Sequence, residues 1–236
     1  MYNRKTVFIS GCNRGIGKAT AELFAKRGWN VIAHTRQPTS EFEDFLYQLA
    51  DINHVTVTPI YFDMKDETTM KEQIQIVVSK PKITINALVN NAGICEIKLF
   101  LMTSLATIRE IFDVNFFSHL RLTQLLLKRI PENGSIVNVA SIDGLIPQKG
   151  ESAYAASKAA MLAWTEVLHL ELLGRIRINA IAPSAVNTDM AHNLEAQAVW
   201  KNNSLIKPYE IAKAIYFLSS EEASEITGEV LKITGK

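Results

Sequence analysis

The sequence predicts an α/β protein built on a mostly parallel sheet of seven strands, with helices covering both faces in a doubly wound arrangement. Two observations lead to this fold class. Short apolar runs rich in β-branched residues alternate along the chain with longer segments of helical periodicity. A chain of 236 residues, 47% of them hydrophobic, can bury one sizeable core, and no linker, charge block or internal repeat divides it. We therefore expect a single domain over residues 1–236.

Each element is expected from a local pattern. Strands are expected at residues 5–10, 30–35, 55–61, 87–90, 135–139, 176–181 and 229–233. Helices are expected at residues 18–27, 42–50, 66–78, 104–129, 153–173 and 208–219, with Asp66 as an N-cap and Pro208 in a first turn. Ligands of such sheets bind beyond the carboxyl ends of the strands, so residues that follow the strands are the candidates for a site.

The turn after the first strand has the composition of a phosphate-binding loop. It holds three glycines in seven residues and leads directly into a helical segment: Gly11-Cys12-Asn13-Arg14-Gly15-Ile16-Gly17. Glycines let the backbone approach a pyrophosphate, and a helix N-terminus offers free N–H groups and the positive end of a dipole. The alternative is a tight turn that merely tolerates glycine. Three glycines at one junction favour a dinucleotide site.

Tyr154 and Lys158 indicate acid–base chemistry. They stand four residues apart in a segment expected to be helical, so the phenol and the ammonium share one face. A phenol with a pKa of about 10 is a poor proton donor at neutral pH, and a neighbouring cation would lower that pKa. Alone, this spacing is weak evidence, because both residue types are common on helix surfaces. Its weight comes from the glycine turn that accompanies it.

Together these motifs resemble those of the short-chain dehydrogenase/reductase family, in its compact classical type. The family's Thr-Gly-x-x-x-Gly-x-Gly is matched by residues 10–17, and its Asn-Asn-Ala-Gly by residues 90–93. Its helical Asn falls on Asn115, its active-site Ser on Ser141, and its Tyr-x-x-x-Lys on residues 154–158. The motifs look most like the 3-oxoacyl-[acyl-carrier-protein] reductase branch. The resemblance implies a Rossmann domain that binds a nicotinamide dinucleotide.

The resemblance also implies a set of cofactor contacts along the carboxyl ends of the strands. Asp63 would meet the adenine amino group, and Thr188 the nicotinamide carboxamide. The implied contacts are Ser10, Gly11, Asn13, Arg14, Gly15, Ile16, Gly17, Thr35, Arg36, Asp63, Met64, Asn90, Ala92, Gly93, Tyr154, Lys158, Pro183, Val186 and Thr188.

The second strand indicates which cofactor is used. NAD enzymes tend to place an acidic residue about 20 positions beyond the glycine turn, whereas this chain ends that strand with Thr35-Arg36 and no carboxylate. Arg36 can bind a 2′-phosphate through charge-assisted hydrogen bonds, and Arg14 adds a second positive charge. The alternative is that both arginines are ordinary solvated loop residues. We expect NADPH rather than NADH.

By resemblance, four residues carry the chemistry. Tyr154 donates a proton to the substrate carbonyl, and Ser141 hydrogen-bonds the carbonyl oxygen. Lys158 lowers the pKa of Tyr154 and binds the nicotinamide ribose, and Asn115 holds a water that links Lys158 to solvent. Such groups meet the negative charge that hydride delivery builds on oxygen. Taken singly, Ser141 would be a capping residue, and Asn115 a hydrogen-bonded helix residue, more often than a catalytic one.

By resemblance, we expect a small carbonyl or alcohol compound as the substrate, with a 3-oxoacyl thioester on acyl carrier protein or CoA as the first guess. Glu151 stands where that branch has glutamine, and Ser184 replaces a glycine that would tolerate a positive φ. A substrate-binding loop is expected around residues 184–206. The expected pocket lining is Ile94, Cys95, Leu145, Ile146 and Trp200.

Two other functions stay open. One is an NAD(P)-dependent dehydrogenase of sugars, polyols or other alcohols, which a strong preference for NAD would favour. The other is a dinucleotide-binding sensor without catalysis. Sensors built on this fold tend to lose the Tyr, Lys or Ser, and this chain has all three.

Composition argues against several other classes. A net charge of +1 gives no basic excess for nucleic acid or an anionic membrane, and no apolar stretch has the length of a signal peptide or a membrane span. Cys12 and Cys95 are not spaced as metal ligands, so we expect no metal and a cytoplasmic location. By resemblance, the helices at 104–129 and 153–173 would pair chains into a homodimer or homotetramer.

Overall fold

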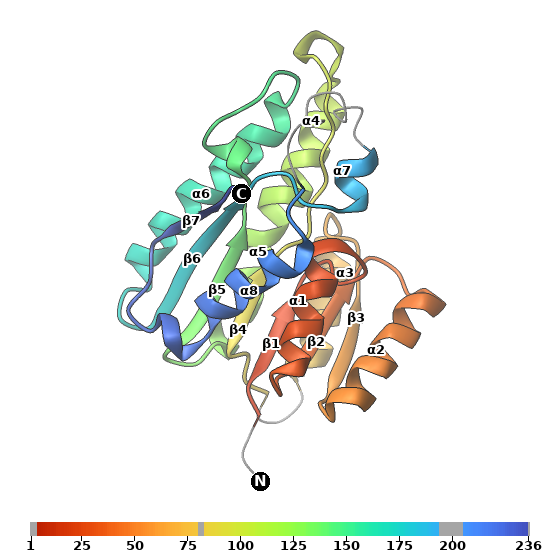
Figure 1. The fold of residues 1–236 in the computed structure, drawn as a ribbon, viewed down its shortest axis with the longest axis vertical. Coiled ribbons are helices and arrows are strands. Elements are labelled where there is room, and N and C mark those ends of the chain that lie inside the picture. Colours follow the sequence, from red (N-terminus) through yellow and green to blue (C-terminus); the bar gives the residue numbers. More distant parts are fainter. Residues whose placement is uncertain (1–3, 80–82, 194–204, 236) are drawn as a thin grey trace.

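The computed structural model describes residues 4–79, 83–193 and 205–235. In this part of the chain the central sheet has seven strands, all parallel, in the order β3-β2-β1-β4-β5-β6-β7 (Figure 1). The strand order reverses between β1 and β4, which is the switch point of a doubly wound sheet. The predicted fold class is confirmed, and the sheet is parallel throughout.

The strands lie close to their expected positions. They are β1 (Thr6–Ile9), β2 (Asn30–Thr35), β3 (Val57–Tyr61), β4 (Ala87–Asn90), β5 (Gly134–Val139), β6 (Ile176–Pro183) and β7 (Val230–Ile233). The apolar, β-branched composition of the inner strands suits their environment, since every residue of β4 and β5 is buried. The largest differences are two residues: β3 begins two residues later than expected, and β6 runs two residues further and ends at Pro183.

Helices connect the strands and cover both faces of the sheet. They are α1 (Gly15–Lys26), α2 (Ser40–Asn53), α3 (Glu67–Val78), α4 (Leu105–Phe112), α5 (Ser118–Leu126), α6 (Ser152–Glu171), α7 (Asp189–Asn193) and α8 (Pro208–Ser219). Asp66 caps α3 as expected, because its carboxylate accepts hydrogen bonds from the backbone N–H groups of Thr68 and Thr69. Pro208 begins α8, where its missing N–H costs no hydrogen bond.

The long helix expected at residues 104–129 is interrupted. A π-helical segment, Asp113–Phe117, separates α4 from α5, and a 3-10 turn, Leu127–Arg129, follows α5. Apolar spacing does not reveal such an insertion, because helical periodicity continues on both sides of it. π-helical turns inside α-helices are frequent at functional sites, and this one contains Asn115, which is fully buried.

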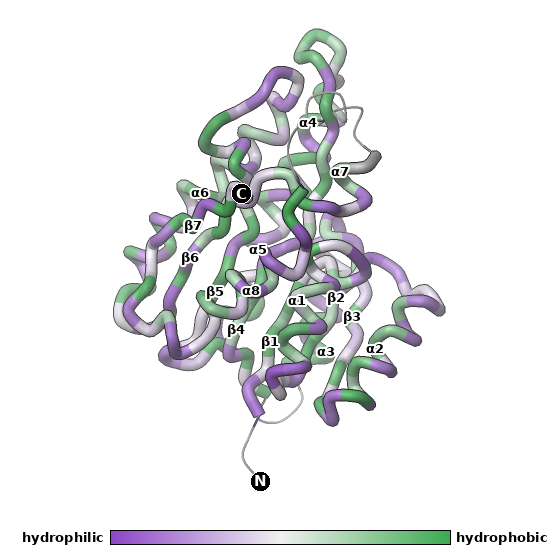
Figure 2. Tube along the Cα trace, in the orientation of Figure 1, coloured by the Kyte–Doolittle hydropathy of each residue, from purple (hydrophilic) through white to green (hydrophobic). Residues whose placement is uncertain are grey.

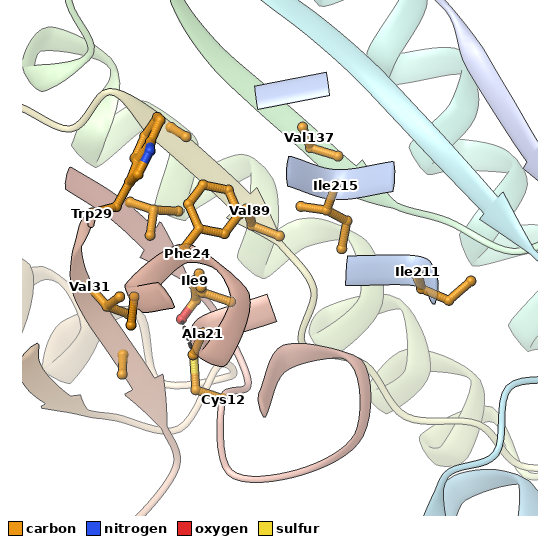
Figure 3. Close-up of a cluster of buried hydrophobic side chains, with 14 of the residues drawn as sticks. Ile9, Cys12, Ala21, Phe24, Trp29, Val31, Val89, Val137, Ile211 and Ile215 are labelled. Atoms are coloured by element: carbon orange, nitrogen blue, oxygen red, sulfur yellow. Dashed lines mark hydrogen bonds between the residues drawn. The ribbon is translucent and has the colours of Figure 1, made fainter. Parts of the chain in front are cut away.

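Alternate side chains of each strand enter two separate cores. Val7 and Ile9 of β1 face α1, α2 and α8, whereas Phe8 faces the layer formed by α3, α5 and α6. Figure 3 shows the first core, in which Phe24 and Trp29 pack edge to face with their ring centroids 5.1 Å apart. The sheet is thus held between two apolar layers, which fixes where its carboxyl ends point.

The hydropathy of the surface follows this arrangement. Hydrophobic and hydrophilic residues alternate along α2, which lies at one side of the molecule (Figure 2). The leucines of α5 pack mainly into the core of the protein, since Leu122 and Leu126 are fully buried in the second core. The helix α7 and the ends of the connecting segments lie beyond the carboxyl ends of the strands (Figure 1).

Candidate active site

A cavity of about 410 Å³ opens at the carboxyl ends of the strands. Most of the residues predicted from the sequence line it, and they come from α6 and from the segments that follow β1, β2, β3, β4, β5 and β6. The predicted residues in its lining are Gly11, Asn13, Arg14, Gly15, Ile16, Thr35, Arg36, Asp63, Met64, Ala92, Gly93, Ser141, Tyr154, Lys158, Pro183, Val186 and Thr188. The other four (Ser10, Gly17, Asn90 and Asn115) are not among its lining residues.

The glycine turn is built so closely that side chains would not fit. Gly11 and Gly15 have positive φ angles of 73° and 56°, which favour glycine. Gly17 has no such angle, but a Cβ on it would lie 1.9 Å from the carbonyl oxygen of Gly11. The first turn of α1 therefore packs directly against the backbone that precedes it.

The N-terminus of α1 fits a phosphate group. Arg14 is its N-cap and makes no side-chain capping hydrogen bond, and the first turn contains no acidic residue. The N–H groups of this turn lack intrahelical acceptors, and the helix dipole places positive charge beside them. An anion held by glycine-rich backbone at this point would satisfy both, so the residues fit the pyrophosphate of a dinucleotide.

The glycine turn is tied to the segment after β4 by a residue that the sequence reasoning did not assign. The Asn91 amide Nδ2 donates to the carbonyl oxygens of Ser10, at 2.8 Å, and Gly11, at 3.1 Å. The Ser10 hydroxyl in turn accepts from the backbone N–H groups of Asn91 and Ala92 at 2.9 and 3.0 Å. The repeated asparagine of Asn-Asn-Ala-Gly was the available signal for this role.

Asn90 has a different environment from the one expected. Its side chain is fully buried and donates to the hydroxyl of Thr123 at 3.1 Å and to Oδ1 of Asn138 at 2.8 Å. The Asn138 amide in turn donates a hydrogen bond to the hydroxyl of Thr165 at 2.8 Å. These contacts join β4, β5, α5 and α6 beneath the site.

His34, on β2, also holds the glycine turn and was missed. Its Nδ1 accepts from the backbone N–H of Gly11 at 3.2 Å, and its Nε2 donates to the carbonyl of Phe62 at 3.0 Å. Burial lowers the pKa of His34 to about 4, which keeps the ring neutral and able to do both. A polar residue within an otherwise apolar strand was the available signal.

Positive side chains stand at the end of the cavity next to β2. Arg36 follows β2 directly and is exposed, and Arg14 lies 3.6 Å from a carboxylate oxygen of Asp189. Lys65 lines the same region and pairs with Glu110 at 2.6 Å. No carboxylate follows β2 at the position where an adenosine ribose would be gripped.

Tyr154 and Lys158 lie one turn apart on α6, as expected. The ammonium of Lys158 is 5.8 Å from the centre of the Tyr154 ring and donates to the carbonyl oxygen of Val139 at 2.9 Å. Lys158 is almost fully buried, and burial lowers its pKa to about 8. The α6 helix thus delivers both side chains to the end of β5.

Burial dominates the pKa of the Tyr154 phenol, and the effect of Lys158 on that pKa stays a prediction. Burial raises the pKa of the Tyr154 phenol, with smaller increases from Cys95, Asp143 and Glu151, while a hydrogen bond with Ser141 lowers it. Desolvation outweighs attraction because a phenolate here would lose its hydration next to acidic groups. Tyr154 therefore carries its proton at neutral pH.

Asn115 fastens the helix to the segment that follows the Asn-Asn-Ala-Gly motif. Its Oδ1 accepts from the N–H of Ile94 at 2.8 Å, and its Nδ2 donates to the carbonyl of Ile94 at 2.9 Å and to the hydroxyl of Ser157 at 3.0 Å. A Cβ on Gly93 would lie 3.3 Å from Oδ1 of Asn115 and 3.5 Å from Nζ of Lys158. The π-helical segment thus brings Asn115 to the same glycine as Lys158.

Ser141 stands at the end of β5 within a group of acidic side chains. Its hydroxyl donates to Oδ2 of Asp143 at 2.8 Å and accepts from the N–H of Asp143 at 3.2 Å. Asp143 and Glu151 are nine-tenths buried or more and line the cavity. Sequence reasoning noted Glu151 only as a departure and overlooked Asp143, two residues from Ser141.

The segment after β6 is unstrained. Ser184 is not among the residues with a positive φ. Its N–H donates to the carbonyl of Ile233 at 2.9 Å, and its hydroxyl donates to the carbonyl of Thr234 at 3.3 Å. Ser184 therefore avoids the strain that a positive φ would impose on a serine. Thr188 donates to the carbonyl of Val186 at 3.3 Å.

The expected substrate pocket is placed only in part. Ile94 and Cys95 line the cavity, whereas Leu145 and Ile146 are exposed outside it. Trp200 and most of the loop around residues 184–206 lie outside the described residues. Within the described part of the chain, no group of three or more His, Cys, Asp or Glu side chains could hold a metal ion, and no helix is long and apolar enough to cross a membrane.

Comparison with known proteins gives a consistent result. A family model described as short chain dehydrogenase matches residues 5–199. The 3-oxoacyl-[acyl-carrier-protein] reductase FabG of Thermotoga maritima is 37% identical over 98% of this chain and 96% of its own. A dehydrogenase/reductase from Sinorhizobium meliloti superposes with a TM-score of 0.89 at 27% identity, covering 98% of this chain and 94% of that one.

A second solved structure, the ligand-free aldohexose dehydrogenase of Thermoplasma acidophilum, has a TM-score of 0.84 at 27% identity and covers 98% of this chain and 93% of that one. The family model spans the glycine turn, Ser141 and Tyr154, which meet at one cavity in the structure. The chain therefore belongs to the short-chain dehydrogenase/reductase family and is an NAD(P)-dependent oxidoreductase.

Proposed function

We propose that this chain is an NADPH-dependent carbonyl reductase, with Tyr154 as the general acid. The observation that carries the proposal is the convergence on one cavity of the uncapped α1 N-terminus, the Ser141 hydroxyl and a protonated Tyr154. The arrangement of these three groups around one cavity, rather than any single motif, supports the function.

The preference for NADPH is supported by charge. A 2′-phosphate would lie near the end of β2, where Arg36 and Arg14 stand on the cavity wall and no carboxylate follows the strand. A guanidinium binds phosphate through charge-assisted hydrogen bonds, typically stronger than neutral ones. Thr35, Asp63 and Met64 would contact the adenosine part of the same cofactor.

The protein's own groups would act on the substrate oxygen. When bound, the nicotinamide supplies a hydride. Tyr154 holds a proton at neutral pH and is placed to donate it as negative charge develops on the carbonyl oxygen, while Ser141 hydrogen-bonds that oxygen. Lys158 would bind the nicotinamide ribose, and Asn115 would hold the water that links Lys158 to solvent in the proton relay. General acid catalysis of this kind contributes typically about 10²–10⁴-fold.

The first substrate to test is a 3-oxoacyl thioester on acyl carrier protein or CoA, because the Thermotoga maritima relative carries that activity in its name. A sugar or polyol dehydrogenase is the second candidate, supported by the likeness to an aldohexose dehydrogenase and by the acidic residues Asp143 and Glu151 in the lining. A sensor without catalysis is less well supported, since Ser141, Tyr154 and Lys158 are all present.

Three further expectations belong to this proposal. A single domain is supported by a sheet that runs through the whole chain in one piece. A homodimer or homotetramer is supported by Val167, Leu170 and Leu173, which are exposed on and just after α6. A cytoplasmic location is supported by the two free cysteines, Cys12 and Cys95.

The test is a fluorescence titration with NADPH and with NADH, followed by turnover of 3-oxoacyl thioesters and aldoses. We expect tighter binding of NADPH, and Arg36→Ala should weaken NADPH by roughly 10- to 100-fold while changing NADH little, because one charged hydrogen-bonding partner is lost. Lys232→Ala, at an exposed position on β7, is the matched control. An equal loss for both cofactors would overturn the role of Arg36.

A further inference from the structure

Asp143 and Glu151 form a buried acidic pair at the substrate end of the cavity. Asp143 lies in the 3-10 turn Ile142–Gly144 that follows β5, and Glu151 is the N-cap of α6. Only 8% of Asp143 and 4% of Glu151 is exposed, although both residues line the cavity. Acidic side chains are almost never this buried unless they are paired or protonated.

The side chains of Asp143 and Glu151 lie within hydrogen-bonding reach of each other. Two carboxylates cannot hydrogen-bond to each other, because an ionised carboxyl group has acceptors only. Two unpartnered oxygens also indicate a missing proton. Oδ1 of Asp143 and Oε2 of Glu151 are both buried, and neither receives a hydrogen bond from another described group. One proton held between the two side chains supplies the missing donor and removes one of two adjacent buried charges.

The pair is connected to the proposed chemistry through Ser141. The Ser141 hydroxyl donates to Oδ2 of Asp143 at 2.8 Å and lies within reach of the Tyr154 hydroxyl. A hydroxyl group has one hydrogen to give. While that hydrogen is held by Asp143, it is not available to a substrate carbonyl, so Asp143 competes with the substrate for Ser141.

We propose that Asp143 and Glu151 share one proton, and that this proton sets how readily Ser141 gives its hydrogen to a substrate carbonyl. The inference rests on the proposed function, which makes Ser141 a partner of the carbonyl oxygen. With the proton present, Glu151 donates to Asp143 and reduces the charge that holds the Ser141 hydrogen. Without it, the doubly charged pair keeps that hydrogen, so Asp143 and Glu151 act as positioning residues.

The same arrangement has the opposite effect on an alcohol substrate. When Ser141 donates to Asp143, its oxygen presents a lone pair, which accepts the hydroxyl hydrogen of an alcohol. The deprotonated pair therefore favours alcohol binding and oxidation, and the protonated pair favours carbonyl binding and reduction. The proton shared by the pair changes how well the carbonyl and the alcohol each bind to Ser141, and it takes no part in hydride transfer.

Other titratable groups also face the pair from the surrounding elements. Cys95, from the segment after β4, has its pKa raised by burial to about 12, and burial also raises the pKa of Tyr154. Both therefore stay neutral between pH 5 and pH 9. Lys158 on α6 has its pKa lowered by burial to about 8. Burial, followed by the charge of Asp143, raises the pKa of Glu151 to about 7. This pKa is lower than that of Lys158.

The test is the pH dependence of kcat for carbonyl reduction at saturating NADPH, measured for the wild type and for Glu151→Gln. In the wild type we expect a fall of roughly fourfold between pH 6 and pH 7.5 as the shared proton is lost, below the pKa of about 8 of Lys158. Glu151→Gln keeps an N–H donor toward Asp143 but does not titrate, so its profile should stay flat until Lys158 titrates. An unchanged fall in Glu151→Gln would overturn the proposal.

Two further measurements separate this proposal from the proposed function. Asp143→Asn removes the competing carboxylate and should raise reduction above pH 8 relative to the wild type, whereas Glu96→Gln, an exposed carboxylate next to Cys95, is the control and should change nothing. Infrared spectra of the protein without substrate should show a protonated carboxyl band that disappears near pH 7 and is missing in Glu151→Gln. Absence of that band in the wild type overturns the shared proton, even if every carbonyl compound is inert.

Discussion

The two ends of the cavity are specified in different ways. At the end formed by β1 and α1, the site is made of backbone: glycines without side chains, an uncapped helix N-terminus, and polar groups of Ser10, His34 and Asn91 that hold the loop. At the end formed by β5 and α6, it is made of side chains whose protonation depends on burial. The first end is fixed by shape, and the second by electrostatics, so the two should respond differently to mutation and to pH.

The largest contrast is expected from Tyr154→Phe. Removing the phenol oxygen should lower kcat by roughly 10²- to 10⁴-fold, the usual contribution of a general acid. The affinity for NADPH should change little, because the backbone end of the cavity is untouched. Steady-state kinetics and fluorescence titration of the same preparation give both numbers. A comparable loss of NADPH binding would mean that Tyr154 has a structural role instead.

Gly17→Ala should produce the reverse pattern. The added Cβ would lie 1.9 Å from the carbonyl of Gly11, so the turn must shift, at a cost of typically about 1–3 kcal/mol for overpacking. We expect NADPH affinity to fall by at least about tenfold, measured by fluorescence, because the first turn of α1 moves. The free energy of unfolding in urea measures how much of the loss is general destabilisation.

Gly28→Ala is the matched control for this change. Gly28 lies just beyond the other end of α1 and has a φ of 80°, but a Cβ there would meet nothing within 4 Å. The substitution should cost roughly 1 kcal/mol of stability through backbone strain alone and leave NADPH affinity unchanged. An equal loss of NADPH affinity in both variants would mean that the close packing at Gly17 does not determine phosphate binding.

The same contrast explains what the sequence could predict. Strand and helix positions follow from apolar periodicity, and the glycine turn, Ser141, Tyr154 and Lys158 stand in short motifs. The π-helical break at Asn115 could not be predicted, because the apolar pattern continues through it. The raised pKa of Tyr154 and the proximity of Asp143 to Glu151 depend on burial and on a contact between two residues eight positions apart, which no helix or strand spacing predicts.

His34 lies at the end of the cavity formed by β1 and α1. At this end, pH should change the stability of the fold and not the catalytic step. Burial lowers the pKa of His34 in the folded state to about 4, from an ordinary value of 6.5. Its contribution to stability is therefore complete above about pH 6.5 and is lost as the pH falls toward 4, because the unfolded chain binds a proton that the folded chain excludes. The slope is at most about 1.4 kcal/mol per pH unit.

His34→Asn should flatten this acid loss, measured as the urea unfolding free energy at a series of pH values from 7 to 4. Asparagine keeps an acceptor and a donor but does not titrate. His54→Asn, at the exposed C-cap of α2, is the control and should follow the wild type. Because Gly11 donates to His34, NADPH binding should weaken over the same pH range in the wild type and less so in His34→Asn. A wild-type acid slope retained in His34→Asn would place the sensitivity elsewhere, with the buried His119, whose pKa burial lowers to about 3, as the next group to replace.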